Sequence, residues 1–132
     1  MKVLAIDFGT KRVGLAVGDT ELGIALPKGV LKNDEHLIDR LYKIIHSTGV
    51  SRVVVGLPLT PSGREGQRAR EVREFVEKLK GRLGDIEVVL WDERYTTLEA
   101  ESRLRELPPK RRRELLDSVS AQIILEEYLQ SR

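Results

Sequence analysis

The first third of the chain consists of short apolar segments separated by turns. Residues 2–6 have the pattern of a buried strand, and residues 12–18 continue with small and β-branched side chains. Residues 23–26 and 29–31 indicate a third strand. Because the connections between these segments are short, we expect an antiparallel three-strand meander.

Beyond this meander the apolar residues recur at helical spacing. A first helix is predicted between Asp34, expected as its N-cap, and Gly49, expected to end it. A second, strongly charged amphipathic helix is predicted from Gln67 to near Gly81 or Gly84.

Two more strands and two closing helices complete the pattern. Residues 52–57 and 86–91 are compact apolar strands, and residues 97–107 and 113–130 are predicted helices separated by two consecutive prolines. No repeat, low-complexity tract or linker divides residues 1–132, so a single domain is expected. This order predicts an α/β fold: a mixed five-stranded sheet, with the meander joined to parallel strands and flanked by helices.

Composition restricts the possible chemistry. The chain has no cysteine, which excludes disulfides and Cys-based zinc sites and favours a reducing compartment. The apolar start meets a charge after four residues, and no later apolar run approaches membrane-spanning length, so a soluble cytoplasmic protein without membrane contact is expected. Charged residues make up 33% of the chain while the net charge is only +2, so any basic surface must be local.

Several carboxylates occupy positions that folding alone does not favour. Asp7 ends one apolar strand, and Asp92 and Glu93 end another. Asp117 lies in the last helix on a face that it shares with Ala121, Ile124 and Tyr128. An acid on an apolar face costs several kcal/mol unless it is paired or bound to a cation.

Each acid also has a purely structural interpretation. Asp7 could satisfy backbone donors in the turn that follows it, Glu93 could pair with Arg94, and Asp117 could cap a helix that begins later than predicted. A purely structural role for all three acids at once is less favoured than for any one of them, because two of the acids end strands at what should be the same edge of the sheet.

Clustered carboxylates raise one another's pKa, and a divalent cation removes that penalty. The chain offers oxygen ligands, no cysteine, and only two histidines, which share one predicted helix, so Mg²⁺ or Mn²⁺ is favoured over zinc. Two such ions can activate water and stabilise the leaving oxygen of a phosphodiester.

Basic residues that could hold phosphate occur in three segments. Lys11 and Arg12 follow Asp7 in a glycine-containing turn, and Arg64 lies in a loop that leads into a helix N-terminus. Arg111 and Arg112 belong to a run of four basic residues at 110–113 that could equally be a solvated helix entry. Aromatic residues are few, so binding should follow the nucleic-acid backbone and shape, with Tyr95 as the one aromatic beside the expected site.

Several motifs, taken in order, resemble those of the YqgF/RuvX family. They are Asp7-Phe8-Gly9-Thr10-Lys11-Arg12-Val13-Gly14, Val55-Gly56-Leu57-Pro58, Gly63-Arg64-Glu65-Gly66, Asp92-Glu93-Arg94-Tyr95-Thr96-Thr97 and Asp117-Ser118-Val119-Ser120-Ala121. The resemblance spans nearly the whole chain and departs from the family pattern only at Gly18 and Ser120, neither of which is a proposed ligand.

This resemblance implies a ribonuclease H-like fold and metal-dependent phosphodiester hydrolysis, in a family described as Holliday junction resolvases and as nucleases of ribosomal RNA maturation. It places the catalytic and metal-binding acids on Asp7, Glu93 and Asp117, preferring Glu93 where spacing alone left Asp92 open. Arg94 and Tyr95 directly follow Glu93 and join the candidate substrate-binding residues.

Other functions remain open from the sequence. An Asp-Gly-Thr turn also binds ATP phosphates in proteins of the actin–hexokinase kind, although those proteins close two domains around the nucleotide. A non-catalytic nucleic-acid or ribosome-assembly module on the same fold is a further alternative. The partner is expected to be a ribosomal RNA precursor or branched DNA, bound by a monomer or a homodimer, since two symmetric junction cuts need two sites.

Overall fold

The computed structural model describes residues 1–93 and 96–131. Its centre is a five-stranded sheet in the order β3-β2-β1-β4-β5. The strands are β1 (Lys2–Phe8), β2 (Arg12–Asp19), β3 (Ile24–Lys32), β4 (Arg52–Pro58) and β5 (Glu87–Glu93). The helices are α1 (Leu37–Thr48), α2 (Gln67–Leu83), α3 (Thr96–Arg103) and α4 (Pro109–Gln130). β1, β2 and β3 pair antiparallel, whereas β4 is parallel to β1 and β5 is parallel to β4, so the predicted mixed α/β sheet is confirmed.

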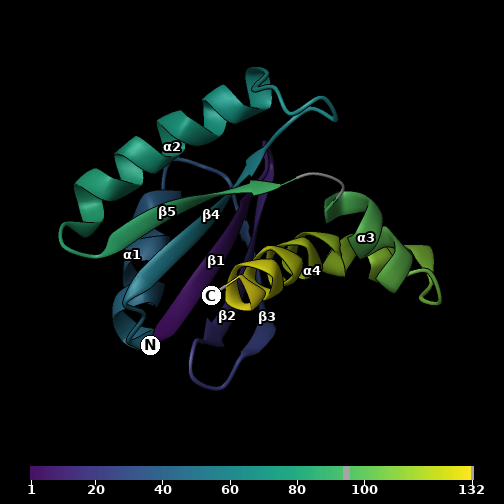
Figure 1. Cartoon of the computed structure of the whole chain (residues 1–132), viewed down its shortest axis with the longest axis horizontal. Helices are drawn as coiled ribbons and strands as arrows, with labels where there is room; N and C mark the ends of the chain where they lie inside the picture. The colour runs from purple at the N-terminus through teal and green to yellow at the C-terminus, as the bar shows by residue number, and fades with distance from the viewer. Residues whose placement is uncertain (94–95, 132) are drawn as a thin grey trace.

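Alternation along the strands divides the core between two faces of the sheet. Leu4 and Ile6 of β1 pack with α1 and α2, while Val3 and Ala5 pack with α4. Figure 1 shows these helices on opposite sides of the sheet, with α3 beside α4. Asp7 is the next residue of the α4-facing series, so strand geometry alone directs its side chain toward that helix.

The third strand of the predicted meander is confirmed. It joins the apolar segments 23–26 and 29–31 in one strand from Ile24 to Lys32. Its pairing with β2 shifts register between Leu15 and Ala16, and Gly29 takes a positive φ of 119° beside this shift.

Several helix ends also differ from prediction. Asp34 is not the N-cap of α1: its Oδ1 instead accepts a hydrogen bond from the His36 backbone N–H at 2.9 Å, in an Asx turn that precedes the helix. Gly49 does end α1, in the left-handed conformation, and α2 runs past Gly81 to Leu83. α4 begins at Pro109, four residues earlier than expected, because proline is well suited to the first helical position.

In the described part of the chain, no helix is both long and apolar enough to cross a membrane.

Candidate functional site

The candidate site lies at the edge of the sheet where β1, β4 and β5 end. Asp7 pairs with Gly14 of β2 across the antiparallel ladder. A Cβ atom added at Gly14 would lie 1.9 Å from the backbone oxygen of Asp117, so the missing side chain lets α4 approach the sheet directly beside Asp7. Asp117 lies two turns inside α4, and the alternative that it caps this helix is therefore wrong.

Glu93 reaches the same region from β5. It lies two residues after Trp91, whose ring contacts Tyr128 of α4 edge-on at a centroid distance of 5.8 Å, so both side chains are on the α4 face. A Cβ atom added at Gly56 would lie 3.1 Å from Glu93 Oε1. Gly56 thus leaves room for the Glu93 carboxylate to lie against the sheet.

Asp92 lies on the opposite face of the sheet. It is exposed, and its charge acts on Arg73 of α2, raising the pKa of that guanidinium together with the larger contribution of Glu65. The alternation of β5 therefore separates the two neighbouring acids and brings only Glu93 toward Asp7.

The electrostatics of Asp7 show that the charges of the other two acids act on it. The pKa of Asp7 is raised to about 7 by burial at the end of β1 and, to a lesser extent, by the charges of Glu93 and Asp117, against the lowering effect of Arg68. Near neutral pH the metal-free site is thus poised between a protonated and an ionised Asp7.

Asp117 already has a cationic partner. Arg12 Nε donates to Asp117 Oδ2 at 2.9 Å, and the two residues are 105 positions apart in the chain. Arg12 was expected to bind phosphate, and here its guanidinium neutralises an acid of the site. The Arg12 side chain is still 58% exposed, so the guanidinium remains accessible from solvent.

The donor chemistry of the site suits a hard divalent cation. Three carboxylates supply only oxygen ligands, and the raised pKa of Asp7 is the penalty that a bound cation would remove. Among residues 1–93 and 96–131, no three acidic or histidine side chains already converge closely enough to hold an ion together. Asp117 is paired with Arg12 in this arrangement, so an ion held by all three acids requires that contact to open.

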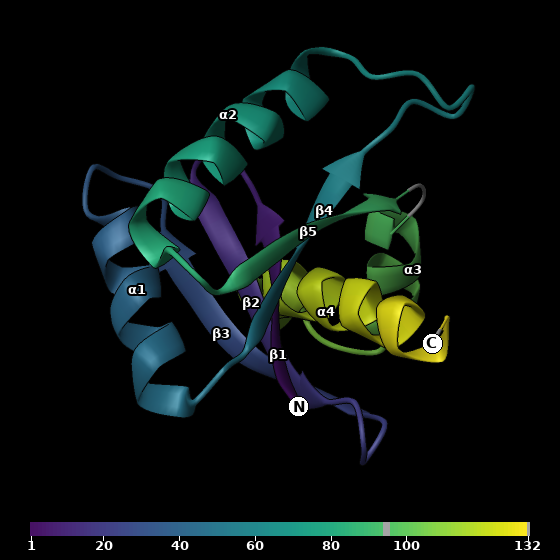
Figure 2. The ribbon, with the colours of Figure 1, turned by 60° about the vertical axis from the view of Figure 1, so that its left-hand side comes forward.

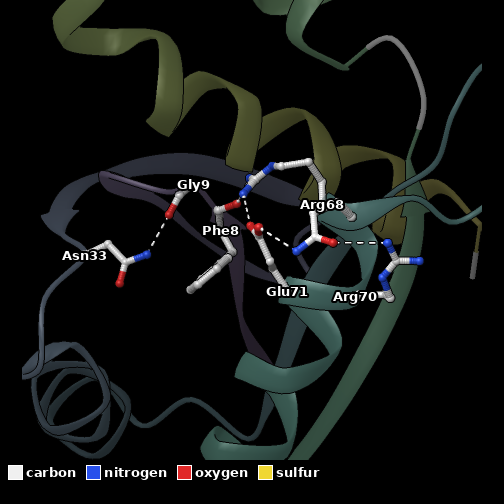
Figure 3. Close-up of polar contacts among 7 residues, drawn as sticks. Phe8, Gly9, Asn33, Arg68, Arg70 and Glu71 are labelled. Atoms are coloured by element: carbon white, nitrogen blue, oxygen red, sulfur yellow. Dashed lines mark hydrogen bonds and ion pairs between the residues drawn. The ribbon is translucent and has the colours of Figure 1, made fainter.

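The turn between β1 and β2 is held by a residue that sequence reasoning missed. Asn33 Nδ2 donates to the carbonyl oxygen of Gly9 at 2.7 Å (Figure 3). The Asn33 backbone N–H donates to the carbonyl of Lys11 at 2.9 Å. A Cβ atom at Gly9 would lie 2.3 Å from the Arg12 backbone oxygen, so only glycine fits this tight turn. The turn presents Lys11 to solvent beside the site.

Other expected substrate-binding residues have different outcomes. Arg64 lies in the loop between β4 and α2, which projects beyond the sheet at the same edge as the acids (Figure 2), and it is exposed to solvent. This loop is closed by mutual backbone contacts, including a 2.9 Å hydrogen bond from Thr60 N–H to the Arg64 carbonyl. Arg94 and Tyr95 lie outside the described residues.

The basic run at 110–113 belongs to the first turn of α4, where positive charge opposes the helix dipole. Helical periodicity places Arg113, four residues before Asp117, on the face of that acid. Arg111 and Arg112, the two residues expected to bind substrate, lie on other sides of the helix. Arg112 lines a cavity of about 310 Å³ with residues of α3.

A further residue near Asp7 was not anticipated. Arg68, in the first turn of α2, donates from Nη2 to the carbonyl oxygen of Phe8 at 2.7 Å. Its charge lowers the pKa of Asp7. The one available signal in the sequence was a basic residue in a first helical turn, which electrostatics disfavours.

Comparisons with known proteins agree with this architecture. A family profile described as "RuvX: Holliday junction resolvase" matches residues 1–131. A relative from Sulfurihydrogenibium sp. (strain YO3AOP1), named "Putative pre-16S rRNA nuclease", is 41% identical over 129 residues, covering 97% of this chain and 89% of the relative. A relative of the same name from Thermus thermophilus is 40% identical over 133 residues, covering 98% of this chain and 97% of its own.

Two solved structures share the fold at low sequence identity. T. thermophilus RuvC in complex with a Holliday junction substrate superposes with a TM-score of 0.60 at 17% identity, covering 100% of this chain and 96% of that one. Fowlpox virus resolvase with Holliday junction DNA superposes with a TM-score of 0.62 at 12% identity, covering 99% and 98%. The chain thus has the ribonuclease H-like fold of the RuvC resolvases.

Proposed function

Because the chain belongs to the RuvX family of nucleases, we propose that it is a divalent-metal-dependent endonuclease whose ion is held by Asp7, Glu93 and Asp117. The observation that carries this proposal is the coupling of the three acids at one sheet edge, where Glu93 and Asp117 both raise the pKa of Asp7. The favoured ions are Mg²⁺ and Mn²⁺, because all three ligands are carboxylate oxygens. When bound, such an ion supplies positive charge for the attacking water and for the oxygen that leaves phosphorus.

Two cationic residues near the acids bind the phosphates of the substrate. Lys11, on the rigid turn after β1, and Arg12, once it leaves Asp117, contact the phosphates that flank the scissile bond. The fixed turn matters because an ordered cation loses little freedom on binding. Phosphate contacts of this kind position the backbone and carry no base information.

The proposed substrate is a structured ribosomal RNA precursor. The names of the relatives at about 40% identity over nearly the full chain support this choice. The description of the family supports a second candidate, a four-way DNA junction. For the junction, two symmetric cuts would require a two-fold dimer, whereas RNA cleavage is compatible with a monomer.

A cleavage assay tests the proposal directly. Wild-type protein and the variants Asp7→Asn, Glu93→Gln and Asp92→Asn are incubated with a labelled 16S rRNA precursor or a four-way DNA junction, in Mg²⁺, Mn²⁺ or EDTA. We expect metal-dependent cleavage of the precursor by wild type and by the Asp92→Asn control, whose side chain faces α2. Asp7→Asn and Glu93→Gln should lose that cleavage.

Two outcomes would contradict the proposal. Cleavage that persists in EDTA would show that the reaction does not depend on a metal ion. Metal-dependent cleavage by Asp7→Asn at the wild-type rate would show that Asp7 is not a required metal ligand. Cleavage of the junction alone would transfer the assignment to DNA while leaving the acids in place.

A further inference from the structure

Arg68 reaches the end of β1 from the face of the sheet opposite to α4. It is the second residue of α2, and its Nη2 bonds the Phe8 carbonyl oxygen at 2.7 Å while its Nη1 bonds Glu71 Oε2 at 2.8 Å (Figure 3). Phe8 directly follows Asp7 and stacks on Phe75 of α2 at a centroid distance of 4.3 Å. The guanidinium is therefore fixed at the sheet edge next to the proposed metal ligand.

The placement of this arginine is costly for folding. The first turn of α2 contains no acid, so the charge of Arg68 opposes the helix dipole without local compensation before Glu71. Ordering an arginine side chain also costs on the order of 2 kcal/mol of rotamer entropy. Water could donate a hydrogen bond to the Phe8 carbonyl oxygen at this edge of the sheet. The need to pair that oxygen therefore explains little of why an arginine occupies position 68.

The two contacts leave most of the guanidinium available. An arginine has five N–H donors, and the hydrogen bonds of Arg68 to Glu71 and Phe8 use its two terminal nitrogens, one partner each. The side chain is 44% exposed, and an exposed pair such as that with Glu71 contributes about 0–1 kcal/mol, which a phosphate can displace. A planar donor set held by a carbonyl is suited to a phosphate oxygen.

Neighbouring arginines of α2 are engaged differently. Arg73 makes a bidentate pair with Glu65, with contacts of 2.6 and 2.7 Å, so its charge is fully matched. Arg70 bonds Gln67 Oε1 at 3.1 Å and lies farther from Phe8 than Arg68 does (Figure 3). Of these three arginines, Arg68 is the one whose charge lowers the pKa of Asp7.

We propose that Arg68 is a substrate-binding residue that holds a backbone phosphate of the nucleic acid on the α2 side of the acids. Lys11 and Arg12 contact the nucleic-acid backbone on the other side of the acids, so the scissile phosphate lies between cationic side chains on both sides. This inference rests on the proposed nuclease function. It adds to that function a phosphate contact from α2, independent of the basic residues 110–113 of α4.

Salt-dependent binding separates a phosphate contact from a structural one. Binding of a fluorescein-labelled 16S rRNA precursor fragment is measured in EDTA by anisotropy across a range of salt concentrations, for wild type, Arg68→Gln, Arg68→Lys and the matched control Arg70→Gln. Loss of one phosphate contact lowers the slope of log K against log salt by about 0.7–0.9. We expect this decrease and several-fold weaker binding for Arg68→Gln, a slope near wild type for Arg68→Lys, and no change for Arg70→Gln.

The outcomes distinguish this inference from the proposed function. Equal slopes for Arg68→Gln and Arg70→Gln would overturn the role of Arg68, even if wild type cleaves and Asp7→Asn does not. If Arg68→Gln fails to fold, Arg68→Met, which keeps the apolar stem and removes the charge, replaces it, and a wild-type slope for Arg68→Met would overturn the role of Arg68. Absence of metal-dependent cleavage by wild type would contradict the nuclease proposal without changing these slopes.

Discussion

Replacing Asp7 with asparagine should make the metal-free protein more stable at neutral pH while abolishing its proposed activity. Burial, together with the charges of Glu93 and Asp117, raises the pKa of Asp7 from 3.8 to about 7. The folded protein therefore holds the Asp7 proton more tightly than the unfolded chain does. This contribution to stability is complete below about pH 4, is lost as the pH rises from about 4 to about 7, and stays lost above that range.

The size of the effect follows from the pKa difference. One pH unit corresponds to ~1.4 kcal/mol, so the ionised Asp7 costs the folded state up to about 4 kcal/mol above pH 7. That is a large part of the 5–15 kcal/mol typical of a folded domain. Asparagine has a similar shape and cannot ionise, so the Asp7→Asn variant avoids this cost at every pH.

Urea unfolding of wild type and Asp7→Asn in EDTA, at several pH values between 4 and 8, measures this directly. The difference in unfolding free energy between the two proteins should change by about 2–4 kcal/mol over that range, in favour of the variant at pH 8. Taking the difference cancels the other titrating groups. Asp92→Asn is the control and should track wild type at every pH. A difference in unfolding free energy that stays constant with pH would refute the claim that folding raises the pKa of Asp7.

Further predictions concern the contacts around Asp7. Arg12→Gln removes the cation paired with Asp117, so calorimetry without nucleic acid should show Mn²⁺ binding tighter by about 1.5- to 5-fold, the equivalent of an exposed ion pair; weaker binding would show that Arg12 helps to build the metal site. Gly14→Ala places a Cβ atom 1.9 Å from the Asp117 backbone oxygen, so it should lower the unfolding free energy by about 1–3 kcal/mol and weaken Mn²⁺ binding. Gly81→Ala, in α2 with open space around it, should instead raise stability by about 0.5–1 kcal/mol in the same urea assay, and an equal loss in both variants would contradict the packing argument.

The fold was predictable because its strands have strong local patterns. The apolar runs of β1, β4 and β5 and the short turns of the meander identify each strand, and the helical spacing between them requires crossovers that make β4 and β5 parallel to β1. Helix ends were less predictable, because capping depends on individual contacts. Asp34, for example, bonds the backbone before the helix and pairs with Arg40 instead of capping α1.

The choice between Asp92 and Glu93 depends on strand alternation together with the face of the sheet that α4 covers. In a strand, residues two apart share a face, so Glu93 must lie with Trp91 and Asp92 with Leu90. Leu90 packs in the core under α1 and α2, and Trp91 packs against α4, the helix that carries Asp117. Alternation therefore selects Glu93 once α4 is known to cover that face.

The partners of the site could not be predicted from the sequence. The Arg12–Asp117 pair joins residues 105 positions apart, and the contact of Arg68 with Phe8 joins residues 60 apart. Both depend on how closely helices approach the sheet, which in turn depends on glycines such as Gly14 and Gly56 whose neighbours are remote in sequence. Local patterns describe elements well, but they contain no measure of such distances.

Anomalous diffraction from crystals soaked in Mn²⁺ tests the central claim most directly, because it locates the ion independently of any substrate. The account predicts a peak bounded by the carboxylates of Asp7, Glu93 and Asp117, with Arg12 moved away from Asp117. The peak should disappear in Asp7→Asn crystals soaked in the same way. A Mn²⁺ peak elsewhere, with none at Asp7, would contradict the account.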